Sequence, residues 1–202
     1  MSCSFGEKYG PAGQAVIQVN ADGENAIFTF GGANRQLAID DVDRAFALCN
    51  SDDLLLIQNE TNQLNYILSR LPGVDFRVAF NAAPADEKLK EYDLSGVDIL
   101  VVNQVEAAAL ADSSDPSNAL EELCVNYPQC EVVLSLGKEG LRHGHGAERL
   151  RLKAFTVQAV DETAAGDSFV GYFLSAVLRG LPCIEALRCG SAAGALAVTE
   201  SG

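Results

Sequence analysis

The stretch Asp53-Leu54-Leu55-Leu56-Ile57-Gln58 is the first clear sign of the fold, because four apolar residues follow one another without a polar interruption. A strand with one face in water would alternate apolar and polar residues, so a continuous run predicts a strand that a parallel sheet buries on both faces. Residues 61–71 follow with the spacing of a helix. A strand-then-helix unit therefore begins here.

The same unit recurs toward the C-terminus. Further strands are predicted at 76–80, 98–102 and 131–136, and further helical stretches at 86–92, 104–110 and 115–125. Two last helices are predicted over 166–178 and 184–198, separated by Gly180-Leu181-Pro182, where glycine ends one helix and proline begins the next. Alternating strands and helices imply an α/β fold with a mostly parallel sheet flanked by helices.

The N-terminal part has a different pattern. Residues 15–19 and 26–30 are predicted to be two antiparallel strands, and the glycine-containing segment 21–24 is predicted to be the turn between them. The acidic run 40–43 is predicted to begin a helix after Ile39, with its charges in water. We therefore expect a small β lid segment over residues 1–38 and an α/β core over residues 39–202.

Charge and composition limit the classes of partner. With 14 Lys plus Arg and 28 Asp plus Glu, the chain of 202 residues has a formal net charge of −14, which disfavours nucleic acid and anionic membrane surfaces. No secretory signal or membrane-spanning stretch is visible, and residues 168–178 are too few to cross a bilayer. Six cysteines without a C-x-x-C pair indicate reduced thiols. We expect a cytoplasmic location.

The segment Val160-Asp161-Glu162-Thr163-Ala164-Ala165-Gly166-Asp167-Ser168-Phe169 carries the strongest indication of chemistry. Small residues at 164–166 leave main-chain N–H groups uncovered where a helix begins, and such groups bind phosphate or a developing oxyanion. Asp167 directly behind them is well placed to take a proton from a hydroxyl group. The alternative is that Asp167 only caps or neutralises the start of the helix.

A second candidate site lies at Asn103-Gln104-Val105-Glu106, directly after a predicted strand. Amide and carboxylate oxygens at the carboxyl edge of a sheet suit a hydrated Mg²⁺ that bridges nucleotide phosphates. The same pattern also describes an N-cap with its capping-box glutamate, so a purely structural role remains open for Asn103 and Glu106.

Other features are weaker alone. Asn81 to Ala85 and Ser135 to Gly140 follow strands and would each be ordinary turns. His143-Gly144-His145 is interpreted as a surface hairpin, because no third zinc ligand lies nearby in the sequence. Cys183 and Cys189 are expected to have core roles.

Together these motifs resemble the ribokinase or PfkB family of carbohydrate kinases, and they occur in the family's order along nearly the whole chain. The matching segments are Gly23-Glu24-Asn25, Gly32-Ala33-Asn34, Glu60 after Leu55-Leu56-Ile57-Gln58, Asn81 to Ala85, Asn103 to Glu106, Gly137 to Gly140, Ala164 to Asp167 and Ala192 to Thr199. The chain has no Walker A motif, so its nucleotide site would be of another kind.

The resemblance implies a kinase that transfers the γ-phosphoryl group of ATP to the terminal hydroxymethyl group of a sugar, ribose in the first instance. Asp167 would be the base, and the amides of Ala164, Ala165 and Gly166 would form the anion hole. Glu60 would contact the sugar. Another sugar or a nucleoside is the alternative substrate.

The resemblance also implies the cofactor and nucleotide contacts. Asn103 and Glu106 would hold Mg²⁺ through water, and Asp161 and Thr163 would help to hold a monovalent cation such as K⁺. The residues implied to face the nucleotide are Asn103, Ser135, Gly137, Lys138 and Gly140. The β lid would cover the sugar and could pair two subunits into a homodimer.

The match has two gaps, at the start and at the end of the family's pattern. Compared with that pattern, the chain is truncated: a sugar-binding first strand and a final segment beside the nucleotide are missing. We therefore expect little sugar-kinase activity from this polypeptide alone. A non-catalytic relative that binds nucleotide is the alternative function.

Overall fold

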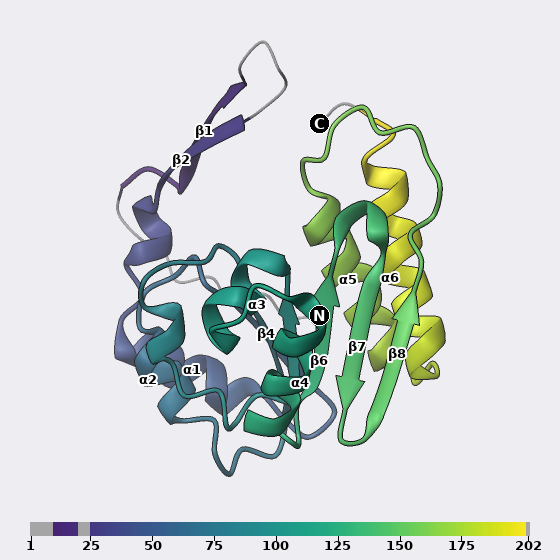
Figure 1. Ribbon diagram of the computed structural model, residues 1–202. Coiled ribbons are helices and arrows are strands. Elements are labelled where there is room, and N and C mark those ends of the chain that lie inside the picture. Colours follow the sequence, from purple (N-terminus) through teal and green to yellow (C-terminus); the bar gives the residue numbers. More distant parts are fainter. Residues whose placement is uncertain (1–9, 20–24, 201–202) are drawn as a thin grey trace.

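A six-stranded sheet forms the centre of the protein (Figure 1), and its strand order follows the order of the chain. The computed structural model describes residues 10–19 and 25–200. The strands of the sheet are β3 (Leu54–Gln58), β4 (Arg77–Asn81), β5 (Ile99–Val102), β6 (Glu131–Ser135), β7 (Leu141–His145) and β8 (Glu148–Leu152).

The four strands from β3 to β6 are parallel to one another, as their apolar runs predicted. The hairpin of β7 and β8 extends the sheet in antiparallel fashion beyond β6. A hairpin was expected at His143-Gly144-His145, but the bounds of its strands were not predicted, because Leu141-Arg142-His143-Gly144-His145 has no apolar run. The expected α/β class with a mostly parallel sheet is confirmed.

Helices cover both faces of this sheet. They are α1 (Ile39–Leu48), α2 (Leu64–Ser69), α3 (Gln104–Ala111), α4 (Pro116–Asn126), α5 (Ala165–Leu178) and α6 (Cys183–Ala197). The helix expected after Ile39 is α1, and the last four helices begin and end within one or two residues of the predicted positions.

Two of the predicted helical stretches are much shorter than expected. Of 86–92, only the 3₁₀ turn η2 (Leu89–Glu91) is helical, since Asp86 accepts a hydrogen bond from the Lys88 N–H and favours a local turn instead. Of 61–71, only Leu64–Ser69 is helical. Before it, the Asn62 side chain accepts from the N–H of Leu37 at 2.9 Å and donates to the C=O of Leu37 at 2.8 Å. Side-chain bonds to the backbone therefore replace helical ones.

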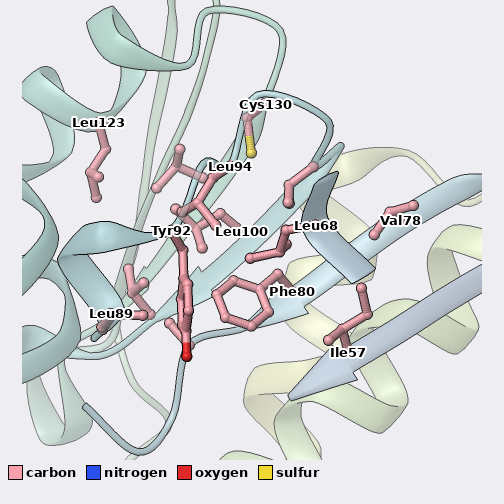
Figure 2. Close-up of a cluster of buried hydrophobic side chains, with 14 of the residues drawn as sticks. Ile57, Leu68, Val78, Phe80, Leu89, Tyr92, Leu94, Leu100, Leu123 and Cys130 are labelled. Carbon is pink, nitrogen blue, oxygen red and sulfur yellow. The ribbon is translucent and has the colours of Figure 1, made fainter. Parts of the chain in front are cut away.

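Two hydrophobic clusters lie on opposite faces of the sheet, and β5 shows how the sequence builds both. Leu100 and Val102 face the cluster shared with α1 to α4, whereas Ile99 and Val101 face α5 and α6. This is the period of two expected for a strand. Figure 2 shows the first cluster, in which Phe80 packs edge-on against Tyr92 at a centroid distance of 6.5 Å.

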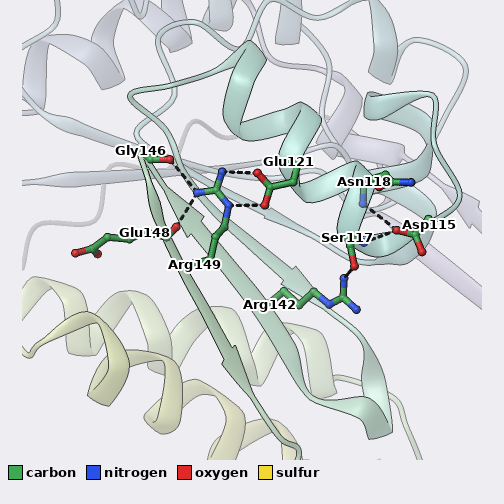
Figure 3. Close-up of polar contacts among 8 residues, drawn as sticks. All are labelled: Asp115, Ser117, Asn118, Glu121, Arg142, Gly146, Glu148 and Arg149. Carbon is green, nitrogen blue, oxygen red and sulfur yellow. Dashed lines mark hydrogen bonds and ion pairs between the residues drawn. The ribbon is translucent and has the colours of Figure 1, made fainter.

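Polar contacts tie α4 to the β7–β8 hairpin. The Arg149 guanidinium donates to both carboxylate oxygens of Glu121 at 2.8 Å, and Arg142 donates to the Ser117 hydroxyl (Figure 3). The Asp115 carboxylate caps α4 by accepting from the N–H groups of Ser117 and Asn118. These contacts are largely exposed, so they orient α4 more than they stabilise it.

The N-terminal strands β1 (Gln14–Val19) and β2 (Asn25–Phe30) form a separate two-stranded antiparallel sheet, as predicted. The predicted turn at 21–24 lies outside the described residues. In Figure 1 this ribbon extends away from the α/β core. Val16, Phe28 and Phe30 are half or more exposed on it. A two-stranded ribbon of this kind has little stability of its own in water.

None of the helices in residues 10–19 and 25–200 combines the length and the apolar character that a bilayer-spanning segment needs.

Candidate active site

The ends of the parallel strands meet along one edge of the sheet. Main-chain bonds join them: the Asn59 N–H donates to Asn81 at 3.2 Å, and the Ala82 N–H donates to Val101 at 3.0 Å. The Ser135 hydroxyl lies 3.4 Å from the Val102 carbonyl oxygen. The segments that follow β3, β4, β5 and β6 are therefore neighbours, as expected of a parallel sheet whose sites lie at its carboxyl edge.

Helix α5 begins at this same edge, and α6 shows why. Cys183 at the start of α6 contacts Glu131, the first residue of β6, so the turn between α5 and α6 lies at the amino edge of the sheet. Since α5 leads into that turn, its N-terminus lies at the carboxyl edge (Figure 1). The tertiary structure thus brings the 164–167 loop to the side where Asn103 and Ser135 lie.

The loop before α5 presents bare main-chain N–H groups. Ala164 has a left-handed φ of 59° and is the N-cap residue without a side-chain hydrogen bond. Among the described residues, the N–H groups of Ala164, Gly166 and Asp167 have no acceptor, whereas that of Ala165 lies 3.4 Å from the Glu162 carbonyl. These donors and the helix dipole together favour an anion at this point.

Space around Gly166 is open. A Cβ atom added there would have no other atom within 4 Å outside its own helix and chain neighbours, and both Gly166 and Asp167 are exposed. The Asp167 carboxylate accepts no hydrogen bond from the described residues at the start of α5. Its side chain therefore does not cap the helix. The carboxylate and the free N–H groups remain available to a ligand.

Asn103 and Glu106 form a complete capping box. The Asn103 side-chain oxygen accepts from the N–H groups of Val105 and Glu106 at 2.7 and 3.1 Å, and the Glu106 carboxylate accepts from the Asn103 N–H and side-chain amide at 2.6 and 2.8 Å. Burial raises the pKa of Glu106, and the two bonds from Asn103 offset part of that rise. The structural alternative for this motif is therefore present in the fold.

Glu60 follows β3 and is exposed beside the base of the lid. The hydroxyl group of its neighbour Thr61 donates to the Asn34 carbonyl at 2.9 Å, and the Thr61 carbonyl accepts from the Arg35 guanidinium at 2.8 Å. Sequence reasoning missed Asn59 in this segment. Asn59 is buried, and its side-chain amide donates to the Pro84 carbonyl at 2.7 Å, which joins the loops after β3 and β4. A polar residue directly after an apolar strand was the available signal.

The loop after β6 is shaped by Gly140. This residue has a φ of 97°, and a Cβ atom there would lie 2.0 Å from the Leu152 carbonyl oxygen. The Leu136 N–H donates to the Gly140 carbonyl at 2.8 Å and closes the loop. Gly137 and Lys138 are consequently held exposed at the carboxyl edge, in the 3₁₀ turn η3 (Gly137–Glu139).

Asp161 and Thr163 lie in the same loop as the free amides. The Asp161 carboxylate accepts from the Thr163 N–H at 2.8 Å, and the Val160 N–H donates to the Val198 carbonyl at the end of α6 at 2.7 Å. The end of α6 thereby anchors the loop that precedes α5.

A cleft of about 260 Å³ lies elsewhere at this edge, near the base of the lid. Residues 61–66, Arg35 and three residues around η2 line it. It borders the segment that carries Glu60 but includes none of residues 164–167, so it is not the anion site.

The comparisons with known proteins agree with one another. The family model described as pfkB family carbohydrate kinase matches residues 5–202. The ribokinase of Haemophilus influenzae is 35% identical over 198 residues, which cover 94% of this chain and 64% of that protein. The chain thus spans slightly less than two thirds of the length of this relative.

Solved structures show the same likeness. The ribokinase of Thermotoga maritima superposes with a TM-score of 0.77 at 30% identity, covering 96% of this chain and 65% of that one. The ribokinase of Cryptococcus neoformans, solved in complex with ADP, gives a TM-score of 0.78 at 27% identity, with coverages of 97% and 68%.

Proposed function

The chain belongs to the pfkB family of carbohydrate kinases, and from this membership we propose that it serves the ATP-dependent phosphorylation of a sugar, D-ribose to ribose 5-phosphate. The observation that carries the proposal is the group of unpartnered N–H donors before α5, at the carboxyl edge of the sheet, with Asp167 in the first helical turn. The ribokinase relatives support ribose as the sugar.

In this proposal Asp167 accepts the proton of the terminal hydroxymethyl group as its oxygen attacks the γ-phosphorus of ATP. The free N–H groups of Ala164 and Gly166, with that of Ala165, receive the negative charge on the transferred group. Amides already aimed at the site stabilise that charge without having to reorganise during the transfer. ADP leaves with the bridging oxygen, and the proton remains on the carboxyl group until it passes to solvent.

Mg²⁺ fits Asn103 and Glu106 only through water. Both carboxylate oxygens of Glu106 accept hydrogen bonds from Asn103, and the Glu106 side chain is buried, so direct coordination would break the capping box. The two residues supply hard oxygen atoms that can receive hydrogen bonds from metal-bound waters. When bound there, the ion would neutralise charge on the nucleotide phosphates.

A monovalent cation fits the loop of Asp161 and Thr163 by the chemistry of its donors, since carboxylate, hydroxyl and main-chain carbonyl oxygens suit K⁺. Asp161 already orients this loop through its bond to the Thr163 N–H. A cation held here would fix the segment that presents the anion-binding amides.

The nucleotide would lie against Ser135, Gly137, Lys138 and Gly140, next to Asn103. The exposure of the turn η3, which follows the carboxyl end of β6, supports this placement. ADP in the Cryptococcus neoformans ribokinase supports an adenine nucleotide as the phosphoryl donor. Glu60, exposed beside the lid base, is the proposed sugar contact from this chain.

The lid supports two further proposals, a division of the chain after residue 38 and a homodimer formed through β1 and β2. Val16, Phe28 and Phe30 are 50%, 54% and 64% exposed on the ribbon, and a second ribbon would cover them. The five described cysteines are free thiols, which supports a cytoplasmic location.

The test is a calorimetric titration of the chain with MgATP, with and without ribose, alongside a coupled assay of ADP release. We expect ATP binding that ribose strengthens, and in Asp167→Asn any turnover should fall by about 100-fold or more because the base is lost. ATP binding that ribose does not alter, with no ADP release, would favour the non-catalytic nucleotide-binding alternative. Absence of ATP binding would refute both functions.

A further inference from the structure

Three side chains from distant parts of the sequence meet at the amino edge of the sheet, on the face covered by α5 and α6. The Glu131 carboxylate, the His143 imidazole and the Cys183 thiol come from β6, β7 and the first residue of α6. His143-Gly144-His145 does belong to a hairpin, but it lies in strand β7 before the turn, and the side chain of His143 is 1% exposed, so this histidine is not on the surface. Two possible partner ligands, 12 and 40 residues away in the sequence, lie beside it in space.

The three donor atoms have the separations of metal ligands. His143 Nε2 lies 3.0 Å from Glu131 Oε1, the Cys183 sulfur lies 3.3 Å from the same oxygen, and sulfur and nitrogen are 3.5 Å apart. In a tetrahedral zinc site, bond lengths of about 2.0 Å to nitrogen or oxygen and about 2.3 Å to sulfur give separations of about 3.3 to 3.6 Å. Two of the three separations lie in this range, and the nitrogen–oxygen separation is about 0.3 Å shorter, so the triangle needs only a small adjustment of the side chains.

The size of the triangle also suits the bond lengths of a zinc ion. A point equidistant from the three atoms lies about 1.9 Å from each, slightly less than the zinc bond lengths. A bound ion would then sit just out of the plane of the ligands, as the centre of a tetrahedron does. Its fourth position would point away from that plane and could hold water.

The cluster does not have the arrangement of a catalytic triad. A nucleophilic cysteine uses one imidazole nitrogen, while the acid orients the ring through the other. Here the same nitrogen, His143 Nε2, faces both the thiol and the carboxylate, and His143 Nδ1 is buried without a partner among the described residues. Burial raises the pKa of Cys183 to about 12, which keeps the thiol protonated and opposes its use as a nucleophile.

The charge around the cluster suits a cation. Burial alone would raise the pKa of Glu131, but the hydrogen bonds from His143 and Cys183 and the charge of the neighbouring histidines hold that pKa below its usual value. Glu148 on the neighbouring strand adds negative charge near Cys183. Glu131 and Cys183 are partly exposed, which leaves a path from solvent.

We propose that Glu131, His143 and Cys183 bind one Zn²⁺ ion, with water as the fourth ligand, and that this ion fastens the start of α6 to β6 and β7. A mixed sulfur, nitrogen and oxygen set suits Zn²⁺ better than Mg²⁺ or Ca²⁺. The site lies at the opposite end of α6 from the loop of Asp161 and Asp167, about 20 Å away by helical rise. It is separate from the proposed kinase chemistry and does not depend on it.

Binding requires a defined proton balance. The thiol releases its proton to solvent, and the imidazole hydrogen moves from Nε2, where it faces the carboxylate, to Nδ1. One proton is therefore released for each ion bound, and no oxidation or reduction takes place.

The experiment titrates the reduced full chain with Co²⁺ as a spectroscopic probe, and then with Zn²⁺. We expect one equivalent of Co²⁺ to produce a thiolate-to-cobalt absorption band and visible bands of tetrahedral intensity, and Zn²⁺ to displace it. Cys183→Ser, which preserves size, should abolish the thiolate band, and Glu131→Gln should weaken Zn²⁺ binding by about 100-fold or more. Cys189→Ser, on the same helix but outside the cluster, should bind like the unaltered chain.

A second measurement keeps the proposal testable if a variant fails to fold. Mass spectrometry of the unaltered chain after brief alkylation should show Zn²⁺ protecting Cys183 more than Cys189, and calorimetry in buffers of different ionisation heat should show release of one proton. Absence of a thiolate band, equal binding by Cys183→Ser, or loss of binding in Cys189→Ser instead would overturn the site.

Discussion

Replacing Gly166 with alanine separates the binding role of the loop before α5 from its role in the fold. Gly166 is the second residue of α5, is exposed and has no left-handed φ, so alanine can adopt its conformation. Its Cβ atom would meet no other atom within 4 Å in the empty protein. Under the proposed function, the methyl group would stand where the transferred phosphoryl group approaches the N–H donors.

The substitution should raise the stability of the protein and lower its binding of MgATP. Because alanine restricts the unfolded chain more than glycine does, the free energy of unfolding should rise by about 0.5 to 1 kcal/mol. Any turnover with ribose should fall by about 100-fold, since a displacement of about 1 Å at the reacting group has that effect on the rate, and affinity for MgATP should fall because the methyl group hinders the approach of the phosphate. Urea unfolding measures the first quantity, and calorimetric titration with ADP-release kinetics measures the second.

Gly171 supplies the matched control. It lies on the same helix, is exposed, and has equally open space for an added methyl group, but it is more than a helical turn away from the loop. Gly171→Ala should therefore raise stability by a similar amount and leave MgATP binding unchanged. A Gly166→Ala protein that is folded and binds MgATP like the unaltered chain would refute the assignment of the anion site.

Two further predictions concern the supports of the site. Gly190→Ala places a Cβ atom 2.9 Å from the ring and the carbonyl oxygen of Phe169, so α5 and α6 must move apart. The free energy of unfolding, measured in urea, should therefore fall by about 1 to 3 kcal/mol. An unchanged value would contradict the close packing of the two helices. Glu106→Gln keeps one of the two acceptor oxygens that bond Asn103 and removes a buried acid. Because burial raises the pKa of Glu106 in the folded state, its contribution to stability is present at low pH and is lost as the pH rises through that pKa. The variant should thus gain stability relative to the unaltered chain between about pH 4 and pH 7 in urea unfolding, and a constant difference would contradict the assigned shift.

Local patterns in the sequence were sufficient to predict the parallel strands, because an apolar run between polar ends is a short-range property. The run at 53–58 became β3, and the strand before Asn103 became β5. The segment 86–92 was wrongly predicted to be helical, since the competing bond from Asp86 to the backbone is a side-chain effect that helical spacing does not include.

The candidate active site was predicted as a set of residues, but without their arrangement. The N-x-x-E pattern of Asn103 and Glu106 allowed both a capping box and a metal site, and the structure shows the capping box with both carboxylate oxygens in use. Asn59 was overlooked because its partner, the Pro84 carbonyl, is 25 residues away in the chain.

The amino-acid sequence alone determined the alternation of strands and helices, the family, and the uncovered main-chain N–H groups at the N-terminus of a helix. Each of these features depends on residues that are neighbours along the chain. The tertiary structure decided which edge that helix faces and which distant side chains meet. Cys183 joins Glu131 and His143 only because α5 runs to the amino edge of the sheet, where the turn that follows it places the first residue of α6. Packing of helices on a sheet sets such long-range contacts, and no local pattern of residues encodes them.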